Sequence, residues 1–164
     1  MIKNAIPTES GRTRPLWKRY EPTTNSQSGL RFTTAFMAEF DPGRRTLAYI
    51  NAGHNAPMLR RGSGMVERLE RGGLPLGIKA DQGYDSGEVA LQAGDWLAIF
   101  TDGLVEAVNF RNEEYGEARV LSQLQTAGGS SPSELLRDMM RDLDAFVGAT
   151  PQHDDVTCLL LKAA

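Results

Sequence analysis

The sequence predicts a layered α+β domain whose strands pair in antiparallel fashion. From Arg31 onward, short apolar stretches alternate with turn residues, which is typical of β-strands. Helical periodicity gathers late in the chain, after Gly103, and the βαβ rhythm of a parallel, doubly wound sheet is missing. A length of 164 residues and a hydrophobic content of 40% suffice for one domain with a real core.

Residues 1–30 differ from the rest of the chain. They contain three prolines, many Ser, Thr, Asn and Gln residues, and no apolar periodicity. Such a composition predicts a poorly ordered polar tail over 1–30, followed by the domain over 31–164. The tail carries five Lys or Arg against two Glu, whereas the remainder carries thirteen basic residues against nineteen acidic ones.

Charge and hydropathy exclude several classes of function. A mildly acidic domain with scattered arginines lacks the basic surface that binds nucleic acid. No apolar run approaches the roughly 18 residues of a membrane span, and the N-terminal stretch lacks the apolar centre of a secretory signal. We therefore expect a cytoplasmic protein that binds neither nucleic acid nor membranes. The single cysteine, Cys158, lies in an apolar run and is expected to pack in the core, so no disulfide forms within the chain.

Three hairpins are expected before the helices. The first joins RFTTAFMAEF to TLAYIN through the turn DPGR, and the second joins MLR to MVERLE through GSG. The third joins EVALQ to WLAIF through AGD, which makes Asp95 most simply a turn residue.

Two helices and a closing strand are expected after the hairpins. In SPSELLRDMMRDLDAFVG, Ser131 is the expected N-cap, Pro132 the first helical residue, Glu134 the partner in a capping box, and Gly148 the C-cap. A weaker helix is expected over about 117–125, and VTCLLLKA closes the chain as a strand.

Three aspartates stand beside two of these strands. Asp102 follows the apolar strand WLAIF, and HDDVTCLLL places Asp154 and Asp155 at the start of the closing strand. If the two strands are antiparallel neighbours, the end of one lies beside the start of the other. Since side chains alternate across a strand, Asp154 and Asp155 should point to opposite faces, so that one of them joins Asp102. Two adjacent carboxylates repel each other unless a cation lies between them, and an all-oxygen site suits Mg²⁺ or Mn²⁺.

Structural explanations exist for the same residues. Asp-Gly is an ordinary turn dipeptide, and the Asp-Asp pair could be a solvated connector. His54, in NAGHNAP, could act as a general acid, or it could lie in a structural loop that Asn51 and Asn55 hold through side-chain hydrogen bonds to the backbone. The glycines of ERGGLPLGI could cradle a phosphate, although a flexible loop at a substrate rim is the simpler expectation.

Five segments, taken in order, resemble the later part of a known family. They are YINAGHNAPMLRR, LPLG, LQAGDWLAIFTDGLVEAVN, YGEARV and QHDDVTCLLL, within about Arg31 to Lys162. Their order and approximate spacing are similar to those of the SpoIIE-type branch of the metal-dependent (PPM-type) serine/threonine protein phosphatases.

The resemblance implies a fold, a metal site and a reaction. The fold would be a β-sandwich of antiparallel strands flanked by helices, with two Mn²⁺ or Mg²⁺ ions held by aspartates. Asp102 and Asp154 would be metal ligands, Gly103 would permit a tight turn after the first, and Asp155 would be the outward partner. The reaction would be hydrolysis of phosphoserine or phosphothreonine, by a water that the ions activate. The substrate would be a regulatory protein such as an anti-sigma-factor antagonist, with a role in sigma-factor regulation and stress response.

One motif of the family is not found in the 164 residues. The family's Asp-x-Ser-Gly-x-Gly segment supplies the aspartate that bridges both metals, and residues 1–40 contain no aspartate. We therefore expect a partial, N-terminally truncated domain that binds one ion weakly or none, turns over poorly, and pairs with other copies of itself through exposed sheet edges. The alternative is a non-catalytic, phosphatase-derived interaction module in signalling.

Overall fold

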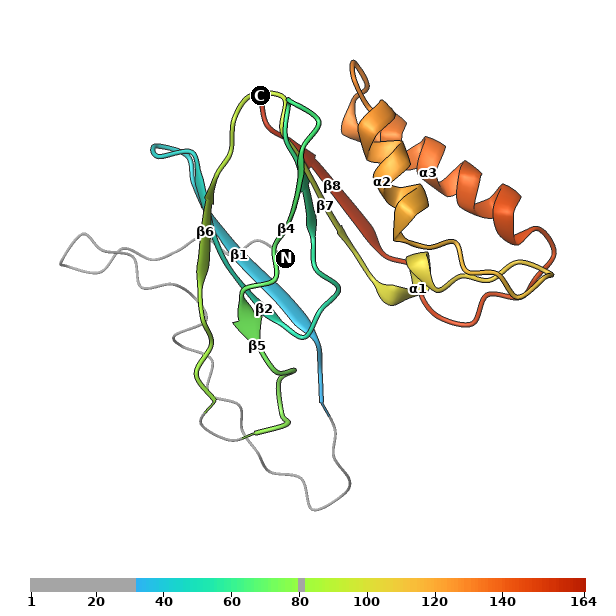
Figure 1. The fold of residues 1–164 in the computed structure, drawn as a ribbon, viewed down its shortest axis with the longest axis horizontal. Coiled ribbons are helices and arrows are strands. Elements are labelled where there is room, and N and C mark those ends of the chain that lie inside the picture. The colour runs from blue at the N-terminus through green and yellow to red at the C-terminus, as the bar shows by residue number, and fades with distance from the viewer. Residues whose placement is uncertain (1–31, 80–81) are drawn as a thin grey trace. The chain divides into compact units, whose positions relative to one another are not determined.

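The computed structural model describes residues 32–79 and 82–164, and the predicted tail over 1–30 lies outside the described residues. The chain divides into two compact units (Figure 1). The first unit contains the described residues up to His54 together with Arg71–Ala90. The second contains Asn55–Glu70 and Leu91–Ala164, and it carries all the helices of the described chain.

The first unit is built around one long hairpin. Strands β1 (Ala35–Asp41) and β2 (Thr46–Ala52) are antiparallel, as predicted. The Asp41 side chain accepts hydrogen bonds from the backbone N–H groups of Gly43 and Arg44 and so closes the turn. On its other side, β2 pairs with two short strands, in antiparallel fashion with β6 (Gly87–Ala90) and in parallel with β5 (Gly72–Gly73).

The glycine pair predicted as a flexible loop is instead the strand β5. The backbone N–H of Asn51 donates to the carbonyl of Arg71 over 2.8 Å, which draws the glycines against β2. A Cβ on Gly72 would lie 1.7 Å from the carbonyl oxygen of Asn51, so only glycine fits there. These glycines serve the close approach of two strands.

The second unit contains a fully antiparallel sheet in the order β4 (Val66–Arg68), β3 (Met58–Arg60), β7 (Trp96–Phe100), β8 (Cys158–Lys162). The predicted hairpin of β3 and β4 is confirmed. The closing strand is confirmed too, although it begins at Cys158 and not at Val156.

The third predicted hairpin, between residues 88–92 and 96–100, is wrong. Strand β6 pairs with β2, whereas β7 lies between β3 and β8 in the other sheet. In the turn between β6 and β7, the Asp95 carboxylate accepts hydrogen bonds from the backbone N–H groups of Gln92, within the turn, and Gly62, outside it. The second of these bonds ties the turn to the β3–β4 connection, so the chain continues into the second sheet.

Asp95 is thus a buried structural carboxylate as well as a turn residue. Its side chain is only 2% exposed and pairs with Arg61 at 2.8 Å. Burial opposes its ionisation, but hydrogen bonds from the Gln92 N–H, the Arg61 guanidinium and the Gly62 N–H outweigh burial and lower the pKa of Asp95 below its ordinary value.

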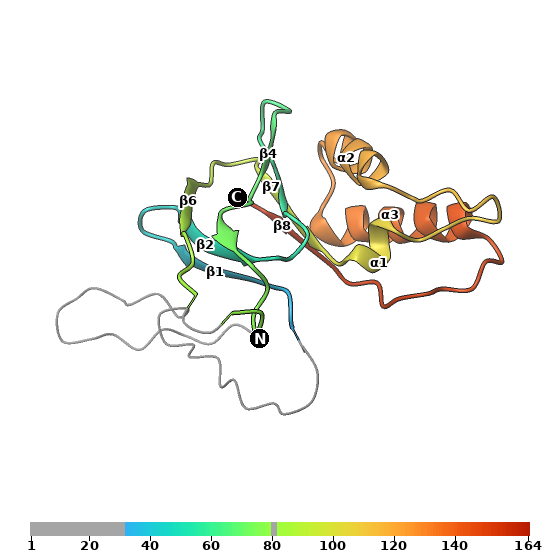
Figure 2. The same cartoon turned by 60° about the horizontal axis from the view of Figure 1, so that its bottom comes forward.

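Three helices accompany the second sheet: α1 (Asp102–Val105), α2 (Glu117–Thr126) and α3 (Pro132–Val147). The capping box predicted for α3 is present, with the Ser131 side chain accepting from the Glu134 N–H and Glu134 accepting from the Ser131 N–H. In Figure 2, α2 and α3 lie side by side, and both contribute to the core of this unit. The most buried members of that core are Met58, Trp96, Ala98, Phe100, Leu104, Val120, Leu124 and Met139.

These features confirm the predicted α+β class, with mainly antiparallel sheets and helices late in the chain. Among the described residues, none of the helices has the length and apolar character that crossing a membrane requires.

Candidate active site

The pairing of β7 with β8 brings the predicted aspartates to one end of the second sheet. The strands are antiparallel, with Phe100 opposite Cys158, so the residues after β7 lie beside those before β8. The contact continues past the strands, because the Thr101 N–H donates to the carbonyl of Thr157 over 3.0 Å. The expected neighbourhood of Asp102 with Asp154 and Asp155 is therefore confirmed at the level of the backbone.

Thr101 fastens the two segments together. Its hydroxyl donates to the carbonyl oxygen of Asp155 and accepts from the N–H of Thr157, each over 3.0 Å. Its own backbone is extended, and α1 begins at the next residue, Asp102. This role was missed from the sequence, where the only signal was a threonine at the N-cap position before the Asp-Gly pair.

Gly103 does not form the tight turn that the resemblance implied. It is buried within α1, and a Cβ on it would lie 2.5 Å from the carbonyl oxygen of Asp155. Glycine is needed here because the main chain before β8 presses against the helix.

The expected alternation of Asp154 and Asp155 across a strand is also wrong. Both residues precede β8 in an irregular segment, so the side-chain period of a strand does not set their directions. The Gln152 side chain donates to the Asp154 carbonyl over 2.6 Å, and the Asp155 N–H donates to the Asp154 carboxylate over 2.7 Å. The carboxylate of Asp154 is thereby turned back on its own loop.

Asp102 and Asp154 have the same local pattern and fit a hard cation. Each carboxylate accepts one hydrogen bond, from the N–H of the following residue. Within 32–79 and 82–164, no donor approaches the second oxygen of either group, and both side chains are exposed. Oxygen atoms of this kind suit Mg²⁺ or Mn²⁺. The donor set is small, since no group of three or more His, Cys, Asp or Glu side chains in the described part of the chain is arranged to hold a metal ion.

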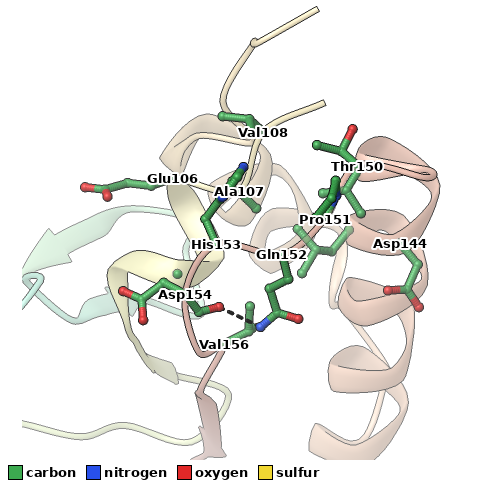
Figure 3. Close-up of a pocket in the computed structure, with 13 residues that line it drawn as sticks. Glu106, Ala107, Val108, Asp144, Thr150, Pro151, Gln152, His153, Asp154 and Val156 are labelled. Atoms are coloured by element: carbon green, nitrogen blue, oxygen red, sulfur yellow. Dashed lines mark hydrogen bonds between the residues drawn. The ribbon is translucent and has the colours of Figure 1, made fainter. Parts of the chain in front are cut away.

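A pocket of about 140 Å³ adjoins this site (Figure 3). Gly103 and Asp154 contribute to it, and Figure 3 shows Asp144 of α3 on the opposite side from Asp154. Glu106, which follows α1, donates its N–H to the carbonyl of Asp102 and also lines the pocket, beside His153. Asp144 was not found from the sequence, because it looks like any solvated residue on an amphipathic helix.

The structure does not place His54 in this group. His54 belongs to the first unit, where its N–H donates to the Asn51 side chain over 2.7 Å and its carbonyl accepts from that side chain over 2.9 Å. The predicted structural role of Asn51 in holding this loop is confirmed.

Cys158 lies at the start of β8, where it packs partly buried against the core of the second unit. Burial raises the pKa of its thiol to about 11, so the thiol is protonated and inert near neutral pH. The predicted packing role of this cysteine is confirmed.

Comparison with known proteins gives a family and several relatives. The family described as Stage II sporulation protein E (SpoIIE) matches residues 15–164. The chain is 28% identical over 128 residues to Protein IcfG of Synechocystis sp., covering 78% of this chain and 20% of that protein. It is 25% identical over 134 residues to Phosphoserine phosphatase RsbU of Bacillus subtilis, covering 80% of this chain and 39% of that protein. The chain thus spans between about a fifth and two fifths of the length of these relatives.

Solved structures share the fold. The SiaA-PP2C domain of Pseudomonas aeruginosa superposes with a TM-score of 0.69 at 24% identity, covering 80% of this chain and 52% of that one. The phosphatase domain of SpoIIE from Bacillus subtilis, presoaked with manganese, gives a TM-score of 0.60 at 17% identity, covering 79% and 56%. At this level of identity the similarity shows the fold alone, and it confirms the predicted PPM-type fold.

Proposed function

The chain belongs to the SpoIIE family of PPM-type phosphatases, and from that premise we propose that it takes part in metal-dependent hydrolysis of phosphoserine or phosphothreonine in a regulatory protein. The observation that carries the proposal is the meeting of Asp102 and Asp154 at one end of the β7–β8 pair, each with an exposed carboxylate oxygen that has no described donor. This is an oxygen-rich site in a chain whose relative RsbU is named a phosphoserine phosphatase.

Asp102 and Asp154 are the residues proposed to hold Mn²⁺ or Mg²⁺. A bound divalent ion supplies Lewis acidity toward a phosphoryl oxygen and makes a water more acidic. The SpoIIE phosphatase structure presoaked with manganese supports this choice of ion. Because the described donor set contains only two such aspartates, we expect one ion to bind weakly to this chain.

The remaining residues position these two ligands. Thr101 binds the Asp155 carbonyl and the Thr157 N–H, so it fixes the loop before β8 against the start of α1. Gly103 lets that loop approach the helix closely. Asp155 turns its N–H to the Asp154 carboxylate, which orients this ligand. The role of each group is thus to hold a carboxylate oxygen in place before an ion or substrate arrives.

The substrate proposed by resemblance is a phosphorylated anti-sigma-factor antagonist or a similar small phosphoprotein. The similarity to RsbU and RsbP of Bacillus subtilis, both named phosphoserine phosphatases, supports phosphoserine as the reacting residue. A role in sigma-factor regulation follows from the same resemblance. A role in stress response stays a prediction, as do a cytoplasmic location and the boundary between tail and domain at residues 30 and 31.

Phosphate release measured with Mn²⁺ tests the proposal. We expect slow, Mn²⁺-dependent turnover of p-nitrophenyl phosphate and of a phosphoserine peptide. Asp102→Asn and Asp154→Asn should each lower it by at least about 100-fold, more than loss of an outer-shell partner does. Asp85→Asn, at an exposed aspartate of the first unit, is the matched control. Turnover that survives both ligand substitutions would contradict the proposal.

The non-catalytic interaction module is the outcome if no turnover is found. Such a module should bind its phosphoprotein partner as tightly after Asp102→Asn as before.

Pairing between copies also stays a prediction. Among the described strands β8 has a neighbour only on its β7 side, and sedimentation of the protein at several concentrations tests whether that edge is used.

A further inference from the structure

Asp154 lies in a segment, residues 151–157, that is neither helix nor strand. The position of its carboxylate therefore depends on hydrogen bonds to the main chain around it. Fixing irregular backbone costs conformational entropy, so such a segment needs partners if it is to hold one shape.

The peptide group between Asp154 and Asp155 is bound on both sides. Its oxygen, which is the Asp154 carbonyl, accepts a hydrogen bond from Nε2 of Gln152 over 2.6 Å. Its N–H, which belongs to Asp155, donates to Oδ1 of the Asp154 carboxylate over 2.7 Å. A trans peptide group is planar, with its C=O and N–H pointing in opposite directions, so the two turn only together. By fixing the carbonyl, Gln152 also fixes the direction of the N–H that holds the proposed ligand.

The other proposed ligand, Asp102, is held in the same way by a helix. The Gly103 N–H donates to Oδ1 of Asp102 over 3.0 Å, and the Asp102 carbonyl accepts from the Glu106 N–H over 2.8 Å. This second bond is the C-cap bond of α1. Asp154 lies outside the helices of the described chain, and there a glutamine side chain supplies the donor to the carbonyl.

Figure 3 shows how Gln152 reaches Asp154. The side chain extends alongside the loop, and its amide nitrogen meets the Asp154 carbonyl. The bond is exposed to solvent, so we expect a moderate effect from its loss.

We propose that Gln152 is a positioning residue for Asp154. Its amide fixes the peptide group that presents an N–H to one carboxylate oxygen of Asp154, and the second oxygen is left for a cation. Gln152 thus does for Asp154 what α1 does for Asp102. The inference rests on the proposed function, in which Asp154 is a metal ligand.

Amide NMR signals of the isotope-labelled protein test this in two ways. Gln152→Met keeps a side chain of similar length and removes the donor. Without metal, the Asp155 amide proton should move upfield, because its bond to the Asp154 carboxylate loosens, whereas the Gly103 signal should stay in place. Mn²⁺ should broaden both signals in wild type, and Gln152→Met should need about fivefold more Mn²⁺, as expected for the loss of one exposed hydrogen bond.

Gln125→Met, at an exposed glutamine of α2, is the matched control and should change neither result. The urea midpoint should be the same in all three proteins, which separates positioning from a loss of stability. The inference is overturned if the Asp155 signal keeps its place, or if wild type and Gln152→Met respond to the same Mn²⁺ concentration. Failure of the proposed function gives a different result, since Mn²⁺ would then broaden neither signal of wild type, and this would overturn the metal site as well.

Discussion

Gly103 and Asp155 are in such close contact that a methyl group on the glycine would come within 2.5 Å of the Asp155 carbonyl oxygen. This contact joins α1, which begins with Asp102, to the loop that carries Asp154. The separation of the two proposed ligands is therefore set by main-chain packing and by Thr101, whose hydroxyl binds the same carbonyl.

Gly103→Ala should separate the two ligands. The added methyl group cannot coexist with the Asp155 carbonyl, so the loop before β8 has to move, at a cost of about 1–3 kcal/mol in the free energy of unfolding. Affinity for Mn²⁺ should fall in the same variant. Gly83→Ala is the control, because nothing lies within 4 Å of a Cβ there. Urea unfolding and Mn²⁺ titration of both variants check this, and an unchanged Mn²⁺ affinity in Gly103→Ala would count against it.

Asp95→Asn should destabilise the second unit in a pH-dependent way. The buried carboxylate loses its charge-assisted bond with Arg61, which we expect to cost about 2 kcal/mol at pH 7. The pKa of Asp95 is lowered on folding, so the ionised carboxylate stabilises the fold above its ordinary pKa of 3.8, and that contribution is lost as the pH falls below this value. The difference in urea midpoint between wild type and variant should therefore shrink from pH 7 to pH 3. A constant difference would contradict this role of the charge.

The thiol of Cys158 should react slowly in the folded protein. Since burial raises its pKa to about 11 from an ordinary 9.0, the reactive thiolate is about 100-fold scarcer at pH 8 than in the unfolded chain. Reaction with a coloured disulfide reagent, with and without urea, measures this. Equal rates in the two conditions would show that the thiol is accessible and ionised.

Local chemistry made much of the fold predictable from the sequence. The β1–β2 turn and the N-terminus of α3 depend on neighbours within four residues: Asp41 with Gly43 and Arg44, and Ser131 with Glu134. Residues 1–30 lie outside the described chain, so the tail predicted there stays a prediction.

The errors arose where distant contacts outweighed local pattern. The turn at Asp95 looked like a hairpin turn, but its carboxylate binds the N–H of Gly62, 33 positions earlier. The Gly72–Gly73 pair looked like a loop because the approach of Asn51 leaves no trace in the surrounding sequence. Within the candidate site, the juxtaposition of Asp102 and Asp154 followed from strand order, whereas Thr101 and Asp144 depend on tertiary packing.

Titration of the protein with Mn²⁺ in a calorimeter tests most directly whether Asp102 and Asp154 hold a cation. Wild type and Asp85→Asn should give the same weak, saturable heat of binding, and Asp102→Asn and Asp154→Asn should each abolish it. The proposed metal site would be contradicted if Mn²⁺ bound all four proteins equally, or bound none of them.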